Sequence, residues 1–205
     1  MGPMIRTVKD PKIRRTEILK AAEELFCSQG YVNTTVEAII QKVGVAKGTF
    51  YYYFKSKEDI LDALVDDMVD KRCKEYKKIA DNPEMAALEK MRHILRGQDS
   101  LSDKNDLTEK LHQPGNRELH ERVNIEVIRR IAPILAQVIE QGKRESVFDV
   151  EHSLETIQFL LAGSQFLLES GLFKWSQEEQ MTRIQSMRSI IERSLGAEPG
   201  SFSFI

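Results

Sequence analysis

The chain of 205 residues has only two cysteines and six prolines. The cysteines, Cys27 and Cys73, lie too far apart in sequence to predict a disulfide framework, and we expect two reduced thiols in a cytoplasm. No apolar run approaches the roughly 18 residues that a membrane-spanning helix needs, so no membrane partner is expected. No apolar segment follows Met1, which predicts that the chain has no secretory signal peptide. These absences favour a cytoplasmic protein.

Sequence motifs of common enzymes are also absent. The chain has no phosphate-binding glycine loop, no GxSxG and no HExxH, and it has no acid/base pair on one short face. We therefore predict no catalytic residues, no cofactor and no enzyme activity. The histidines and cysteines never occur at HxxxH or CxxC spacing, so no metal ligand is assigned. A metal sensor whose ligands meet only in space remains an alternative. The four histidines are His93, His112, His120 and His152.

What the sequence does contain is an uneven distribution of charge. The net charge is −2, but residues 1–57 carry ten Lys/Arg and five Asp/Glu, which gives 10 − 5 = +5. Residues 58–205 carry twenty Lys/Arg and twenty-seven Asp/Glu, which gives 20 − 27 = −7. A basic N-terminal part on an acidic body is typical of a protein that binds nucleic acid through one end.

The pattern of apolar residues predicts an all-α fold of about nine helices. Ile18, Ala22, Leu25 and Phe26 form a stripe of helical period that ends before Gly30, the residue type expected just past a helix. Thr34-x-x-Glu37 predicts a capping box at the start of the next helix. Pro133 should kink its helix, because proline removes a backbone amide. The longer helices are expected at about 57–80, 84–97, 103–113, 117–142, 151–171 and 177–195.

Residues 34–59 carry the most informative motif. They predict a short helix, a turn through Gly44, a second short helix with three tyrosines at 51–53, and the start of a third helix. Two short helices joined by a glycine-containing turn are typical of a helix-turn-helix, whose second helix enters the DNA major groove. Phe50 and Phe54 take the inward stripe, and successive helical residues point about 100° apart, so at least two tyrosines must face outward. Tyrosine suits a DNA surface, where its hydroxyl donates to phosphate.

This segment closely resembles the N-terminal DNA-binding domain of the TetR family of transcriptional regulators, over about residues 11–62. The likeness runs through Thr34-Thr35, Gly44-Val45, Lys47-Gly48-Thr49-Phe50-Tyr51 and Ser56-Lys57-Glu58. The resemblance implies that the two threonines lie beside a phosphate, that the recognition helix begins at Lys47, and that Lys57 binds a phosphate. This sequence departs from the family pattern at Ile40, Ala46 and Tyr53. The implied DNA-binding residues are Thr34, Thr35, Lys47, Gly48, Thr49, Tyr51, Tyr52, Tyr53 and Lys57.

A basic lead-in precedes the helix-turn-helix motif. Its cations either contact the DNA backbone or minor groove, or belong to a solvated terminus, and the sequence leaves both readings open. Few side chains in the motif suit bidentate base readout, so we expect DNA shape to contribute to specificity. The lead-in consists of Arg6, Lys9, Lys12, Arg14 and Arg15.

A single helix-turn-helix reads only a few base pairs, which predicts a homodimer on a palindromic double-stranded operator with half-sites about 34 Å apart or a multiple of that. The resemblance implies that the last two helices form the dimer interface. Both contain apolar stripes, although the same faces could instead be buried within the monomer. The expected interface residues are Leu154, Ile157, Leu161, Ser164, Leu168, Ile184, Met187 and Ile191.

The resemblance also implies a small-molecule pocket among residues 84–142. We expect domains at 1–56 and 57–196 and a flexible tail at 197–205, with an unidentified effector releasing a repressor from its operator. An ordinary packed core, and with it a ligand-independent regulator controlled by protein partners, is the alternative. The candidate lining residues are Met91, Leu95, His120, Val123, Asn124, Val127 and Phe159.

Overall fold

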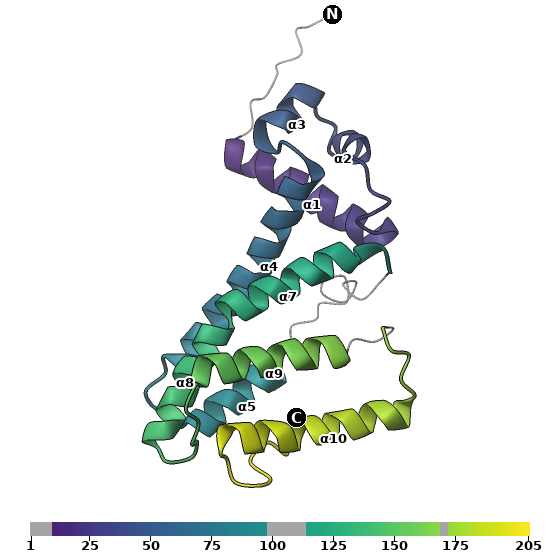
Figure 1. Cartoon of the computed structure of the whole chain (residues 1–205). Coiled ribbons are helices and arrows are strands. Elements are labelled where there is room, and N and C mark those ends of the chain that lie inside the picture. The colour runs from purple at the N-terminus through teal and green to yellow at the C-terminus, as the bar shows by residue number, and fades with distance from the viewer. Residues whose placement is uncertain (1–9, 98–113, 169–171) are drawn as a thin grey trace, which may run out of the picture.

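The computed structural model describes residues 10–97, 114–168 and 172–205, and helices account for all regular structure in these ranges. The first three helices form one end of the molecule, the next helix leads away from them, and the later helices lie along it and around its other end (Figure 1). The expected helix at 103–113 lies outside the described residues. The helices are α1 (Pro11–Gln29), α2 (Val36–Val43), α3 (Lys47–Tyr53), α4 (Lys57–Ala80), α5 (Ala87–Gly97), η1 (Pro114–Asn116), α7 (Arg117–Arg130), α8 (Ala132–Arg144), α9 (Ser153–Leu167) and α10 (Gln177–Leu195).

The cap of α2 differs from the sequence prediction. Thr35, not Thr34, is the N-cap, and its hydroxyl accepts from the backbone N–H of Ala38 at 3.1 Å. The Thr34 side chain is buried, and its hydroxyl donates to the carbonyl of Gly30 at 2.8 Å. The predicted capping box between Thr34 and Glu37 is therefore wrong by one residue, because Thr34 is used to close the turn after α1.

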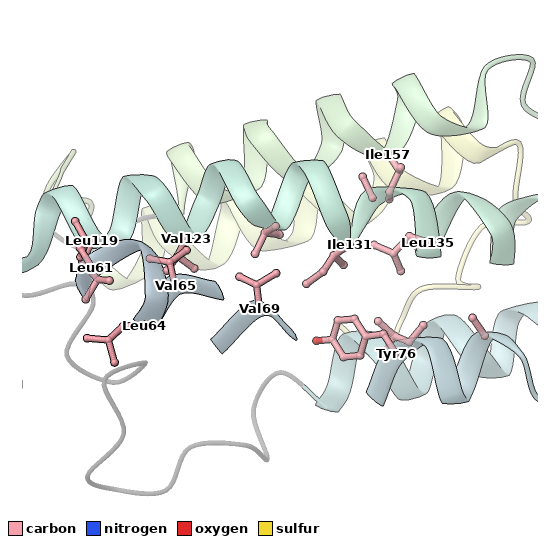
Figure 2. Close-up of a cluster of buried hydrophobic side chains, with 14 of the residues drawn as sticks. Leu61, Leu64, Val65, Val69, Tyr76, Leu119, Val123, Ile131, Leu135 and Ile157 are labelled. Carbon is pink, nitrogen blue, oxygen red and sulfur yellow. The ribbon is translucent and has the colours of Figure 1, made fainter. Parts of the chain in front are cut away.

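Helix α4 joins the N-terminal helices to the rest of the protein. Ser56 caps it by accepting from the N–H of Asp59 at 3.1 Å, and the helix then runs for 24 residues, or about 36 Å. One side of α4 is apolar and packs on α7 and α8, where Leu61, Val65 and Val69 face Leu119 and Val123 (Figure 2). Burial of these side chains fixes α4 to the body.

Beside the apolar contact, α4 and α7 are joined by ion pairs. Asp62, Asp66 and Asp70 recur every four residues on α4 and therefore share one face. Arg122 of α7 pairs with Asp62, and Arg130 pairs with Asp66 and Asp70. Such partly exposed pairs each contribute about 0–1 kcal/mol, so the apolar surface provides most of the stability of this seam.

The helix expected at 117–142 is divided in two. Helix α7 ends at Arg130, Ile131 separates the helices, and Pro133 lies in the first turn of α8. Proline has no backbone N–H and is tolerated in a first turn, where that group would have no helical partner. The expected kink at Pro133 thus becomes a helix boundary, and α8 continues to Arg144.

The segment 197–205, expected to be a flexible tail, is packed against the body. The Phe202 side chain is fully buried and stacks on Phe148, with the ring centroids 6.2 Å apart. Glu192 of α10 accepts hydrogen bonds from the backbone N–H groups of Gly200 at 2.9 Å and Phe202 at 3.0 Å. The flexible tail expected here is instead held by Phe202, which fills a core position that the local sequence did not indicate. No helix in the described ranges is long and apolar enough to cross a membrane.

Candidate nucleic-acid interface and ligand cavity

Helix α3 presents two tyrosines to solvent. Phe50 is fully buried and Phe54 is 3% exposed, so they hold α3 on the N-terminal core as predicted. Tyr51 and Tyr52 are 42% and 78% exposed, while Tyr53 is half-buried with its ring 4.9 Å from that of Tyr52. Two exposed aromatic rings on a short helix form a surface suited to sugars and phosphates.

Gly48 lies on the same surface and has no internal reason to be glycine. A Cβ placed on it would meet no heavy atom within 4 Å, and its backbone φ is not in the positive region. Gly44, in contrast, adopts a left-handed conformation with φ 71° at the end of α2, which favours glycine. Neither the described neighbours of Gly48 nor its backbone conformation therefore requires glycine at this position.

The polar residues around α3 are partly accessible. The Lys47 ammonium lies 3.8 Å from a Glu37 carboxylate oxygen, and both side chains are about 70% exposed. Thr49 is half-buried in the first turn of α3, and Thr35 is exposed at the start of α2. Buried Thr34 has no accessible surface to offer to a phosphate.

Lys57 is engaged inside the protein. Its ammonium donates to the carbonyl of Tyr31 at 2.9 Å and lies 4.1 Å from the centroid of the Tyr31 ring. Burial raises the pKa of Tyr31 to about 12. Lys57 thus ties the start of α4 to the turn after α1, a contact that sequence reasoning did not anticipate.

The same turn is held by the start of α7. Asn116 is fully buried, its side-chain oxygen accepts from the Tyr31 N–H at 2.8 Å, and its amide nitrogen donates to the carbonyl of Phe26 at 3.2 Å. The N–H of Val32 donates to the Gly115 carbonyl at 3.1 Å. A Pro-Gly-Asn sequence is typical of a turn, but only the structure reveals that residues 114–116 hold the N-terminal helices.

Within the body lies a cavity of about 460 Å³, a size within the range of about 300–1,000 Å³ typical of ligand sites. Helices α4, α5, α7, α8, α9 and α10 all contribute to its walls. Most lining side chains are apolar, and the polar ones include Arg72, Ser164 and Gln165. The cavity favours the small-molecule pocket over the packed-core alternative for this region. The sequence-predicted residues that line it are Met91, Leu95, His120, Val123, Asn124 and Val127.

The placement of Phe159 in the pocket was wrong, because its side chain is 81% exposed on α9. Most of the residues predicted to form the dimer interface also do not face outward as expected. They point into the cavity, because α9 is apolar around most of its circumference and periodicity could not tell its inner face from its outer one. Leu154 and Ile184 are half-buried outside the cavity. The stripe residues that line the cavity are Ile157, Leu161, Ser164, Leu168, Met187 and Ile191.

The described residues hold no cluster of three or more histidine, cysteine or acidic side chains that could bind a metal ion. His112 and the rest of 98–113 lie outside the described ranges, as do Arg6 and Lys9 of the basic lead-in. Burial raises the pKa of the Cys73 thiol, which keeps it protonated.

Comparison with known proteins identifies the family. The model for bacterial regulatory proteins of the tetR family matches residues 18–64, and a tetracyclin repressor-like C-terminal domain matches residues 100–190. The fatty acid metabolism regulator protein of Bacillus subtilis (strain 168) is 31% identical over 141 residues, which cover 66% of this chain and 71% of that protein. The chain belongs to the TetR family. The homologues of this TetR-family protein are DNA-binding transcriptional regulators rather than enzymes.

Other matches are shorter or more distant. The transcriptional repressor KstR2 of Mycolicibacterium smegmatis is 35% identical over 75 residues, which cover 37% of each chain. FadR from Bacillus subtilis, whose crystal structure in complex with stearoyl-CoA is known, is 23% identical in sequence to this TetR-family protein, and the two structures superpose with a TM-score of 0.62. That alignment covers 89% of this chain and 98% of FadR. At this identity the likeness establishes the fold.

Proposed function

We propose that this protein is a homodimeric repressor that binds a palindromic operator through α3 and leaves it when a small molecule enters the cavity. The observation that carries the proposal is the joint presence of an exposed tyrosine surface on α3 and a cavity in the body of one TetR-family chain. Helix α4 follows α3 in the chain, packs on α1, and contributes Arg72 and Tyr76 to the cavity wall. A ligand that changes the position of α4 also changes the spacing of two recognition helices.

For DNA binding, we assign the main contacts to the accessible residues of α3. Tyr52 and Lys47 are suited to phosphate oxygens, Gly48 permits close approach, and Tyr51 lies where sugars or base edges can pack. Thr35 is suited to a phosphate beside the N-terminus of α2, where backbone N–H groups favour an anion. The remaining residues expected to touch DNA are more enclosed, so we assign them a supporting role; they are Thr34, Thr49, Tyr53 and Lys57.

For dimerisation, we propose the outward faces of α9 and α10 in place of the predicted stripe. These faces expose large apolar side chains, which are unusual on a monomer unless a partner covers them. Gly163 of α9 has no heavy atom within 4 Å of where a Cβ would lie, so a partner helix can approach closely there. The proposed interface residues are Phe159, Phe166, Leu167, Met181 and Ile190.

For release, we propose a shift between two conformations of the dimer. A ligand that prefers the conformation with wrongly spaced recognition helices lowers DNA affinity, and DNA lowers ligand affinity by the same factor. The mainly apolar walls favour an effector with an apolar part. That the relative from Bacillus subtilis is named a fatty acid metabolism regulator supports a compound with an alkyl chain.

The proposal is tested by selecting operators from a pool of random double-stranded DNA with the purified full-length protein. A palindrome with two half-sites is expected, and binding should weaken steeply between low and moderate salt because phosphates are neutralised. Release is then measured by fluorescence anisotropy of a labelled operator, with dodecanoate and dodecan-1-ol as probes. Selection of no palindrome would refute the DNA-binding assignment, and an operator complex unaffected by either probe would refute release by an alkyl compound.

A further inference from the structure

Arg72 stands out among the residues that line the cavity. Val69 and Tyr76, three residues before and four after it, lie on the same side of α4 and point toward α7 and α8 (Figure 2). Arg72 joins Tyr76 in the cavity wall and is half-buried. Among the described side chains that line the cavity, that of Arg72 is the one with a permanent charge.

No carboxylate in the described ranges lies within ion-pair distance of Arg72. This separates it from the neighbouring arginines on α7, since Arg122 and Arg130 each pair with aspartates of α4. Those aspartates, at 62, 66 and 70, lie on the face of α4 that meets α7 and are already paired. A half-buried guanidinium that loses hydration and has no anion among the described residues is unfavourable unless a ligand supplies the anion.

The rest of the cavity is suited to the other part of such a ligand. Met91 and Leu95 of α5, Val127 of α7 and Leu161 of α9 contribute apolar wall from three different helices. The guanidinium offers several N–H donors in a planar fork that matches the oxygens of a carboxylate or phosphate. One cation beside an extensive apolar wall therefore matches a molecule with an anionic head and an apolar chain.

We propose that Arg72 recognises the anionic head of the effector, and that the effector is an amphipathic anion with a carboxylate or phosphate on an alkyl or acyl chain. This rests on the proposed function, in which the cavity binds the effector. Because Arg72 belongs to α4, the charge of the ligand acts directly on the helix that leads to the DNA-binding end. Occupation of Arg72 by an anion thus links recognition of the ligand to movement of α4.

The test compares four probes with the same chain length: dodecanoate, dodecyl phosphate, lauroyl-CoA and uncharged dodecan-1-ol. Affinity is measured by isothermal titration calorimetry on full-length wild type, Arg72→Gln and Arg72→Lys. Lys74→Gln is the matched control, because Lys74 is an exposed cation on the same helix outside the cavity. Thermal unfolding of each variant verifies that it is folded.

We expect Arg72→Gln to weaken binding of the anionic probes by about tenfold to a hundredfold, the effect of a lost charge-assisted hydrogen bond, and to leave dodecan-1-ol nearly unchanged. Arg72→Lys should keep part of the preference for anions, and Lys74→Gln should match wild type. The tightest of the three anions identifies the source of the negative group, whether free acid, phosphate or coenzyme A conjugate.

Equal losses for charged and uncharged probes in Arg72→Gln would overturn the inference, as would wild-type protein that binds dodecan-1-ol as tightly as the anions. Failure of all three anions to bind would overturn it as well. These outcomes differ from failure of the proposed function: a protein released from its operator by dodecan-1-ol alone would still be a ligand-released repressor, but not one that reads charge through Arg72.

Discussion

Replacement of Asn116 by alanine is the sharpest probe of how the DNA-binding end is attached to the body. The Asn116 side chain is fully buried at the start of α7 and bonds to residues on both sides of the turn that follows α1. In Asn116→Ala, the backbone N–H of Tyr31 loses its acceptor in a site closed to water. The Phe26 carbonyl is less affected, because it still accepts from the N–H of Gly30 at 3.0 Å.

The expected loss of stability follows from these two bonds. A buried donor left without a partner costs about 1–3 kcal/mol, and the second bond adds about 1 kcal/mol. The sum is about 2–4 kcal/mol, and each kcal/mol lowers the Tm of a chain of this size by about 2–4 °C. Asn116→Ala should therefore unfold roughly 5–15 °C below wild type in a calorimetric scan.

Asn33→Ala is the control, because Asn33 is exposed and its bond to the Gln29 carbonyl at 2.9 Å competes with water. Its Tm should stay close to that of wild type. Asn116→Ala should also bind the selected operator more weakly, since the N-terminal helices lose one of their fixed contacts with the body. A Tm for Asn116→Ala equal to that of Asn33→Ala would refute the reasoning.

Three further outcomes are expected. Gly48→Ala should keep or raise the Tm, because alanine is favoured over glycine in a helix by up to about 1 kcal/mol and the space around the new Cβ is open. Fluorescence anisotropy should nevertheless report weaker operator binding by this variant. An unchanged operator affinity would show that Gly48 does not belong to the DNA interface. Phe166→Glu should convert the dimer to a monomer in analytical ultracentrifugation, because the 55% exposed Phe166 ring belongs to the proposed dimer interface. A variant that remains dimeric would show that the interface lies elsewhere. Wild type should lose stability as pH rises from 10 to 12, because the unfolded chain releases the Tyr31 proton at about 10 and the folded protein only at about 12. Tyr31→Phe should lack this loss in denaturant titrations at each pH, and an equal slope in both proteins would contradict the assignment.

The helix-turn-helix was predictable because its signals are local. The four-residue spacing of Phe50 and Phe54 sets the inward face of α3, and the outward direction of Tyr51 and Tyr52 follows from helical geometry alone. The cap of α2 was predicted one residue early. Either Thr34 or Thr35 can serve as an N-cap, and the choice depends on the Gly30 carbonyl, which becomes available only when α1 and the following turn have folded.

Only the tertiary structure assigned the faces of α9. Its sequence is apolar around most of the helix, so Leu161 and Phe159 were equally plausible for either side until packing on α8 and α10 turned Leu161 inward. The same holds for Arg72, which in sequence resembles its charged neighbours on α4.

The sequence by itself determined an all-helical DNA-binding regulator, because helical periodicity, glycine turns and the tyrosine run act over a few residues. The tertiary structure decided the rest. The junction at Asn116, the buried end at Phe202 and the cavity charge at Arg72 depend on contacts between residues far apart in the chain, and no short-range pattern encodes which partners those residues meet.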